Sequence, residues 1–202
     1  MTEVSDRSPG FPGGGQEERI IDAALSCIAR WGVAKTTLDD VAREASCSRA
    51  TVYRVFPGGK EALLEAVGRR EMARFFEAVT GRLQAADSLE DLLIAGITEA
   101  GRRLRDHRAL RFLVAHEPEM IIPRLGFTEA EAVLGCASAV AAPYLARWLA
   151  DADALRAAEW VVRLVLSYSM LPNPEVDLTD EESVRGLVRT FVLPGLTPLV
   201  TS

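Results

Sequence analysis

The chain has 202 residues, of which 49% are hydrophobic and 26% are charged, and its formal net charge is −6. That composition predicts one globular unit or two small ones sharing a helix, and it excludes a wholly disordered chain. No uncharged run reaches the roughly 20 residues that a membrane-spanning helix needs. The N-terminus has acidic residues and Gly/Pro where a signal peptide has basic and apolar ones. We therefore expect a soluble, cytoplasmic protein with a disordered tail at residues 1–15 and no membrane partner.

The cysteines and histidines show no arrangement typical of a metal site or a disulfide framework. Cys27, Cys47 and Cys136 are odd in number and widely spaced, which fits a reducing compartment. His107 and His116 have no Cys or carboxylate cluster at ligand spacing. The sequence also shows no nucleophile–base pairing and no phosphate-cradling Gly-rich loop. We expect no metal, no cofactor and no enzymatic activity.

Charge is unevenly distributed along the chain. Residues 1–60 hold eight basic and eight acidic side chains, so the acidic excess lies entirely in residues 61–202. Within residues 41–60 the balance is reversed, with four basic side chains against one acidic side chain. A local basic patch of this kind is typical of a nucleic-acid-binding surface, even on an acidic protein.

Apolar residues recur every three or four positions and no period-2 alternation appears, which predicts an all-α fold. The helices expected in chain order, about nine in number, span residues 16–31, 37–45, 49–56, 60–86, 88–105, 107–116, 128–150, 153–171 and 179–193. Thr37 and Ser48 are suited to cap the second and third helices, and three later helices begin with a Ser/Thr-x-x-acidic pattern. Gly32 is expected to end the first helix, and Pro143 to bend the seventh.

The second and third helices have the lengths of a helix-turn-helix braced by the helix before them. Val52 and Phe56 can face the core, which leaves the other side of the third helix for the major groove. Basic planar side chains suit guanine edges and phosphates, and a small side chain suits a thymine methyl. The pattern alone equally fits a short helix with a solvated, arginine-bearing face. The residues on the expected DNA-facing side are Arg49, Ala50, Tyr53 and Arg54.

Residues 19–64 closely resemble the N-terminal DNA-binding domain of the tetracycline-repressor (TetR) family of transcriptional regulators. The matching elements, in the family's order and spacing, are Ala24, Trp31-Gly32, TTLDDVA at 36–42, Ser48, TVY at 51–53, Phe56 and KEAL at 60–63. The resemblance implies a DNA-binding domain at residues 16–60 followed by a ligand-binding and dimerisation domain at 61–202. It implies a sequence-specific regulator of transcription.

The resemblance also assigns DNA contacts to individual residues. Phosphate and sugar contacts are implied for Thr37, Thr51, Tyr53 and Lys60, and base-edge contacts for Arg49 and Ala50, with Tyr53 able to reach both. The full set of expected DNA-binding residues is Thr36, Thr37, Ser48, Arg49, Ala50, Thr51, Tyr53, Arg54 and Lys60. Val55 stands where the family commonly has histidine, so we expect one phosphate contact fewer, with Arg54 compensating beside it. A Pro-Gly-Gly loop precedes Lys60 in place of a shorter one.

A homodimer on a palindromic operator is implied as well, with the last two helices of each subunit forming a four-helix bundle. The helix expected at 153–171 is apolar nearly all round. This fits an interface, and it is also the pattern of a central core helix. The expected interface residues are Val161, Val162, Val165, Leu166 and Ser169.

The effector is expected to be a small lipophile such as a fatty acid or an acyl-coenzyme A ester, because the candidate cavity residues are mostly apolar. Those residues, each of which also fits plain core, are Phe75, Phe76, Leu104, Phe112, Met120, Leu125, Tyr144 and Trp148. The Arg102-Arg103-Arg105 run fits either an anion contact or a solvated helix face.

A ligand bound more tightly in one dimer geometry would release or favour DNA. We expect a repressor, although the sequence does not separate repressor from activator. The alternative is an all-α protein–protein adaptor that keeps the fold without binding DNA. A steep salt dependence of duplex binding separates these two functions.

Overall fold

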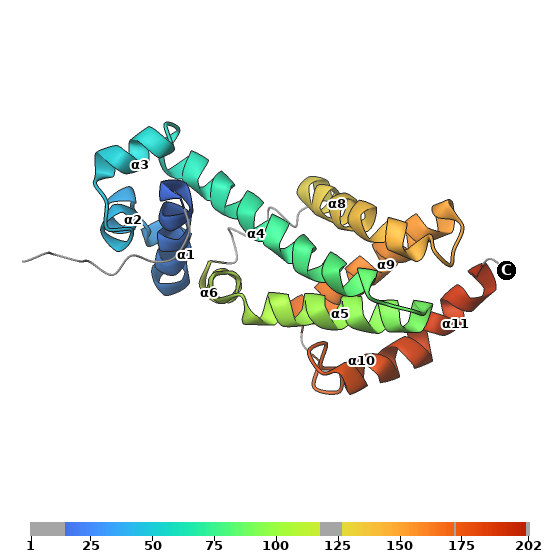
Figure 1. The fold of residues 1–202 in the computed structure, drawn as a ribbon. Coiled ribbons are helices and arrows are strands. Elements are labelled where there is room, and N and C mark those ends of the chain that lie inside the picture. Colours follow the sequence, from blue (N-terminus) through green and yellow to red (C-terminus); the bar gives the residue numbers. More distant parts are fainter. Residues whose placement is uncertain (1–14, 118–126, 172, 201–202) are drawn as a thin grey trace, which may run out of the picture. The chain divides into compact units, whose positions relative to one another are not determined.

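The computed structural model describes residues 15–117, 127–171 and 173–200, and these residues form helices and no β-strand (Figure 1). The all-α prediction is confirmed. The chain divides into two compact units, Met1–Val67 and Gly68–Ser202, each of which is described by itself below. The division falls inside helix α4 (Gly59–Gln84), whereas the sequence places it at residue 60. The predicted N-terminal tail lies almost entirely outside the described residues.

The first unit is a small helical core of regularly spaced apolar side chains. Its helices are α1 (Gln16–Lys35), α2 (Leu38–Glu44), α3 (Arg49–Val55) and the first part of α4. Ile20 and Val52 are both 0% exposed, so α1 and α3 meet in one buried cluster. Burial of such side chains stabilises a fold by about 1.5–3 kcal/mol each. The other fully buried large side chains of this cluster are Cys27, Val41 and Leu63.

Two local signals set the course of the chain between α1 and α2. Gly32 does not end α1 as predicted. It kinks the helix, with φ 82° and ψ 174°, and the helix continues to Lys35. Glycine alone adopts that backbone conformation readily, because it has no Cβ. Thr37 then caps α2: its Oγ1 accepts a hydrogen bond from Asp40 N at 3.2 Å, and the Asp40 carboxylate accepts one from Thr37 N at 3.2 Å.

The second unit packs α5 between α9 and α10, with α8 against α9. Its elements after α4 are α5 (Leu89–Asp106), α6 (Arg108–His116), α8 (Phe127–Leu145), α9 (Asp151–Met170), α10 (Glu181–Leu187), the π-helical turn η2 (Val188–Val192), α11 (Leu193–Leu196) and the 3-10 turn η3 (Thr197–Leu199). Ile97 on α5 and Val188 on η2 are almost fully buried at the centre. None of the helices in the described ranges is long and apolar enough to cross a membrane.

Three boundaries in the second unit differ from the sequence prediction. The helix that contains Pro143 ends at Leu145, earlier than expected, because a turn follows it. Asp180, not Thr179, caps the last helical segment, since its side chain accepts a hydrogen bond from Ser183 N at 2.9 Å. That segment is broken into α10, η2 and α11, where the sequence predicts one continuous helix.

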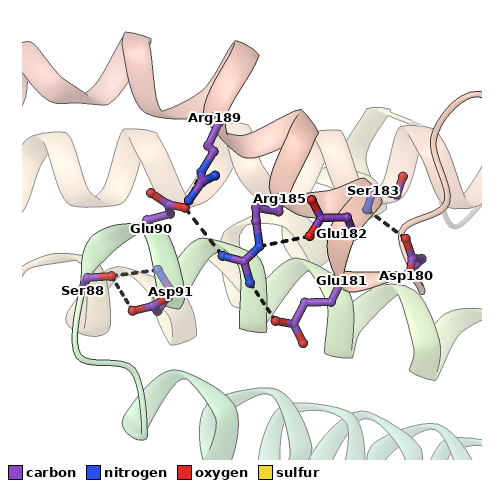
Figure 2. A network of polar contacts seen from close by, with 9 residues as sticks. All are labelled: Ser88, Glu90, Asp91, Asp180, Glu181, Glu182, Ser183, Arg185 and Arg189. Atoms are coloured by element: carbon purple, nitrogen blue, oxygen red, sulfur yellow. Dashed lines mark hydrogen bonds and ion pairs between the residues drawn. The ribbon is translucent and has the colours of Figure 1, made fainter.

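Charged side chains join the first turn of α5 to α10 and η2 (Figure 2). Glu90 on α5 lies 2.7 Å from Arg189 Nε and 3.7 Å from Arg185 Nη1. Arg185 also contacts Glu181 at 2.9 Å and Glu182 at 3.5 Å. This network links α5 to α10 and η2, and Arg189 lies 99 positions after Glu90 in the sequence.

Candidate functional site

Helix α3 presents one buried side and one exposed side, as its sequence predicts. Val52 is 0% exposed and Phe56, which follows the helix, is 5% exposed. Ser48 fixes the start of α3, because its Oγ accepts a hydrogen bond from Thr51 N at 3.1 Å. The Ser48 and Thr51 hydroxyls are themselves bonded at 2.9 Å. The side chains left exposed on the outer side are Arg49, Ala50, Tyr53 and Arg54.

Arg49 is held at the surface by two neighbours. Its Nη1 donates to Asp39 Oδ2 on α2 at 2.9 Å, and its Nη2 donates to the Tyr53 hydroxyl at 3.4 Å. The guanidinium carbon also lies 5.5 Å from the centroid of the Tyr53 ring, within the range of a cation–π contact. The Tyr53 hydrogen bond first, and the Asp39 carboxylate second, raise the pKa of Arg49 above its usual value. The side chain is therefore a permanent cation on the outer side of α3.

Arg54 and Lys60 are both bonded to other parts of the first unit. Arg54 Nη2 donates to Gln16 Oε1 at the start of α1, at 2.9 Å. Lys60 Nζ donates to the carbonyl oxygen of Val33, in the last turn of α1, at 2.7 Å. Gly59 precedes Lys60 with φ 68°, a left-handed conformation that favours glycine. The loop therefore directs Lys60 toward the end of α1.

Thr36 differs from the other residues expected at DNA, because its side chain is inside the unit. It is 3% exposed, and its hydroxyl donates to the Gly32 carbonyl at 2.6 Å, across the kink in α1. Thr37, the next residue, is exposed at the start of α2. Val55, at the position where a histidine was expected by family resemblance, is partly buried against the core. Thr36 thus holds the backbone that positions Thr37.

A cavity of about 310 Å³ lies in the second unit. It is bordered by the last turns of α5, by α6, by the end of α9 and by residues 176–179. Its charged lining side chains are the cations Arg105 and Arg111 and the carboxylate Asp177, and Ser169 and Thr179 add hydroxyl groups. The apolar and aromatic lining side chains are Leu104, Leu110, Val114, Tyr168, Met170, Val176 and Leu178.

The 176–179 wall of this cavity is fastened by hydrogen bonds. Asp177 Oδ1 accepts from Thr179 N at 2.8 Å and from the Thr179 hydroxyl at 2.6 Å. Arg102 Nε donates to the Thr179 carbonyl at 2.8 Å, and Arg105 donates to the Thr179 hydroxyl. The Thr179 hydroxyl is the main cause, and the two arginine cations a lesser cause, of a pKa of Asp177 below its ordinary value.

Gly101 on α5 is the point of closest approach to this wall. A Cβ added to Gly101 would lie 2.6 Å from Leu178 Cβ and 2.7 Å from the Leu178 carbonyl oxygen. A Cβ carbon essentially never lies that close to another atom, and the Leu178 backbone has no flexible end to move away. Only glycine fits here without a shift of the wall.

Of the residues predicted from the sequence to contact an effector, Leu104 lines the cavity. Phe75, Tyr144 and Trp148 are partly buried against the core of the second unit instead. Phe76 makes an edge-to-face contact with Phe75, with ring centroids 5.6 Å apart. For these residues a ligand contact stays a prediction.

The remaining residues of that set lie elsewhere. Phe112 on α6 stacks on His116, with ring centroids 4.4 Å apart. Met120 and Leu125 lie outside the described residues. The sequence did not indicate Arg111, Val114 or the 176–179 segment, because no spacing rule connects residues that far apart.

The residues expected at a dimer interface do not all face outward on α9. Val165 is 7% exposed within the core of its own unit, and Val161 packs against that core. Val162 and Leu166 are half-buried, and Ser169 borders the cavity of the second unit. Three larger side chains that sequence reasoning did not assign to this surface are exposed: Leu155 at 49%, Trp160 at 45% and Phe191 on η2 at 67%.

The cysteines and acidic residues offer little other chemistry in the described ranges. No group of three His, Cys, Asp or Glu side chains there is arranged to hold a metal ion. Cys27 is buried, and this burial raises the pKa of its thiol, with a smaller contribution from Glu44. A raised pKa disfavours the reactive thiolate.

Comparison with known proteins identifies the family. Residues 20–67 match the family model of bacterial regulatory proteins of the tetR family. The HTH-type transcriptional regulator Rv1255c of Mycobacterium tuberculosis (strain ATCC 25618 / H37Rv) is 31% identical over 184 residues, which cover 90% of this chain and 85% of that protein.

Solved structures share the fold over nearly the whole chain. The TetR family repressor AlkX from Dietzia sp., implicated in biodegradation of n-alkanes, has a TM-score of 0.65 and 26% identity, covering 93% of this chain and 100% of AlkX. AibR, solved in complex with isovaleryl coenzyme A and operator DNA, has a TM-score of 0.58 and 21% identity, covering 88% and 98% of the two chains. This chain belongs to the TetR family of DNA-binding transcriptional regulators.

Proposed function

We propose that this regulator is a homodimeric repressor that leaves a palindromic operator when an anionic lipophile binds the cavity of the second unit. The expected effector is a fatty acid or the acyl part of a coenzyme A ester. The observation that carries this proposal is the cavity itself, in which apolar side chains are combined with two cations, Arg105 and Arg111, against one carboxylate, Asp177, which is already bonded to Thr179. A mostly apolar pocket with a few precisely placed polar groups is typical of a small-molecule binding site.

The size and charge of the cavity favour a small acid over a large polar ligand. Its volume of about 310 Å³ is at the lower end of the roughly 300–1,000 Å³ typical of ligand pockets. Arg105 is already bonded to Thr179, whereas Arg111 is exposed on α6. An acid whose carboxylate contacts Arg111 and whose apolar chain lies along α6 therefore contacts both the charged and the apolar side chains of the lining. The relation of AlkX to n-alkane degradation and the isovaleryl coenzyme A bound to AibR support an effector with an acyl or alkyl chain.

DNA recognition is proposed for the outer side of α3 and the caps beside it. Arg49 and Ala50 contact base edges, and Tyr53 lies next to them. Thr36 acts indirectly in this proposal, because its buried hydroxyl holds the kink before α2. The proposed contacts to the DNA backbone come from Thr37, Ser48, Thr51, Tyr53, Arg54 and Lys60.

Dimerisation is proposed for the apolar surface of α9 and η2. Leu155 on α9 and Phe191 on η2 expose large apolar side chains, and such side chains are typical of the core of a homodimer interface. Trp160 is exposed on a different side of α9, five positions after Leu155. Val162 and Leu166 are half-buried and lie on the same side of α9 as Leu155, seven and eleven positions after it, whereas Ser169 borders the cavity. A two-fold dimer requires an operator with two half-sites whose spacing matches the two α3 helices.

The dimer is tested by sedimentation equilibrium of Leu155→Asp. We expect the native protein to sediment as a dimer and the variant to shift toward a monomer. Ala73→Asp places the same charge at an exposed position of α4 and serves as the control. A dimer unaffected by Leu155→Asp contradicts the proposed interface.

The regulatory function is tested by fluorescence anisotropy on duplex DNA from immediately upstream of the protein's own gene, with and without fatty acids and acyl-coenzyme A esters. We expect specific binding that weakens steeply with salt and that one compound reverses. Arg111→Gln should weaken the response to acids, and Arg108→Gln, an exposed arginine of α6 outside the cavity lining, should not. A compound that tightens binding instead contradicts the proposed release of the operator by the effector. No binding at low salt favours the adaptor.

A further inference from the structure

We infer that Asp39 is a specificity-determining residue, which holds Arg49 ready for a base edge and at the same time disfavours DNA of other sequences. The inference rests on the proposed base contact of Arg49. It concerns only the first unit, in which Asp39 lies in the first turn of α2 and Arg49 is the first residue of α3.

The ion pair between these residues does not contribute much to folding. The side chains of Arg49 and Asp39 are 56% and 55% exposed, and the two atoms joined at 2.9 Å lie in solvent. Exposed ion pairs contribute little to stability, because water screens them and two side chains must be ordered. Their effect here is on the position of the guanidinium.

Tyr53 restrains the same guanidinium from a second direction. Its hydroxyl accepts from Nη2 at 3.4 Å while Asp39 accepts from Nη1 at 2.9 Å. An arginine has five N–H donors in a rigid plane, so these two contacts leave further donors for DNA. A side chain that is ordered before binding loses less conformational entropy when it binds. Arg49 is thus arranged to read a base edge without first being immobilised.

The charge of Asp39 acts on every DNA sequence alike. An exposed carboxylate beside α3 repels the phosphates of any duplex, so it weakens all binding. Only a duplex with a suitable base edge, such as guanine O6 and N7, recovers this loss through Arg49. The pair therefore widens the ratio between specific and non-specific affinity, which is the quantity that matters for finding an operator.

The test is a double-mutant cycle of Asp39→Asn and Arg49→Ala, measured by anisotropy on two duplexes. One duplex is selected with this protein from a random library, and the other is a scrambled sequence of the same composition. We expect Asp39→Asn to weaken binding to the selected duplex and to tighten binding to the scrambled one, with a loss of about tenfold in their ratio. In the Arg49→Ala background the same substitution should no longer change that ratio.

A charge-matched control separates positioning from simple repulsion. Glu44→Gln removes a carboxylate that pairs with Arg30 at 2.8 Å in the same unit. This substitution should change the affinities for the two duplexes by the same factor. Equal shifts for Asp39→Asn as well would overturn the inference, and so would tighter binding to the selected duplex, which would mean that Asp39 sequesters Arg49. Circular dichroism melting checks that each variant is folded.

The experiment distinguishes two claims, the base contact of Arg49 and the role of Asp39. If Arg49→Ala binds the selected duplex as well as the native protein does, the base contact itself is wrong. If Arg49→Ala weakens binding but the cycle shows no coupling, the base contact stands and the role of Asp39 is wrong. If no sequence is enriched from the library, both are wrong.

Discussion

The two units of this chain build their candidate sites in opposite ways. In the first, the outer side of α3 comes from one short stretch, Ser48 to Arg54, that a single turn positions. In the second, the cavity joins α5, α6, the end of α9 and residues 176–179, so that Leu104 and Thr179 line it from 75 positions apart. A site formed by one chain segment depends on local features such as helix caps and turns. A site formed by four segments depends on how the whole core packs.

The largest effect that separates the units is expected from cavities in their cores. Ile20→Ala in the first unit and Ile97→Ala in the second each remove a side chain that is at most 1% exposed. Each should lower the free energy of unfolding by about 2–5 kcal/mol. Urea unfolding measures the loss of stability. DNA binding and ligand binding are measured separately on the same variants. If the units are independent, Ile20→Ala impairs DNA binding first and Ile97→Ala impairs ligand binding first; equal loss of both activities contradicts their separation.

A smaller effect is expected where α5 touches the cavity wall. Gly101→Ala places a Cβ against the Leu178 backbone and should cost about 1–3 kcal/mol of stability while weakening ligand binding. Gly81→Ala is the matched control, because Gly81 lies within α4 and its added Cβ would meet nothing within 4 Å. That substitution should stabilise by about 0.5–1 kcal/mol. Thermal unfolding compares the two variants, and equal melting temperatures would show that the wall is free to move.

Each unit contains a helix whose start is capped by a hydroxyl side chain, so the effect of removing the cap can be compared between the units. Thr37 caps α2 in the first unit, and Ser88 caps α5 in the second by accepting from Asp91 N at 3.0 Å. Thr37→Ala and Ser88→Ala should each cost about 1 kcal/mol. Denaturant midpoints measure the loss, and Thr37→Ala should also weaken DNA binding. An unchanged DNA affinity would contradict the proposed contact of Thr37 with the DNA backbone.

The smallest expected effect is a change in stability as the pH falls into the acid range. Hydrogen bonds from Thr179 hold the pKa of Asp177 below its ordinary value of 3.8, and the Thr37 hydroxyl does the same for Asp40 in the first unit. A depressed pKa stabilises the folded state above the ordinary value, and this contribution is lost as the pH falls through the folded pKa. The stability difference between the native protein and Asp177→Asn should therefore be present at pH 7 and shrink below about pH 4. Urea titrations at several pH values measure it, with Asp40→Asn as the counterpart; a difference independent of pH contradicts this cause.

Local signals made the first unit predictable from the sequence. The cap residues Thr37 and Ser48 were recognisable because a hydroxyl before a helix satisfies its free amides. The alternation of apolar and polar side chains on α3 showed which side is buried. What the sequence did not reveal was the use of Gly32 as a kink, with Thr36 bonded across it. A glycine after a helical run more often ends the helix, and only the backbone angles separate the two outcomes.

The second unit was predictable in its helices but not in its site. Apolar periodicity located α5, α6 and α9, since each buries one face. It could not show that α6 and residues 176–179 border one cavity, because that arrangement depends on how the core of the unit packs. Large apolar residues such as Tyr144 and Trp148 look alike in sequence whether they line a cavity or fill a core, and here they pack on the core.

The contact between Gly101 and Leu178 also restricts how this regulator can evolve. Because any larger residue at 101 displaces the wall, substitution at this one position cannot reshape the cavity gradually. Leu110, Arg111 and Val114 on α6 have no such restriction, since they are exposed or half-buried. Descendants of this chain that respond to a new compound should therefore keep glycine at 101 and differ at Leu104 or on α6.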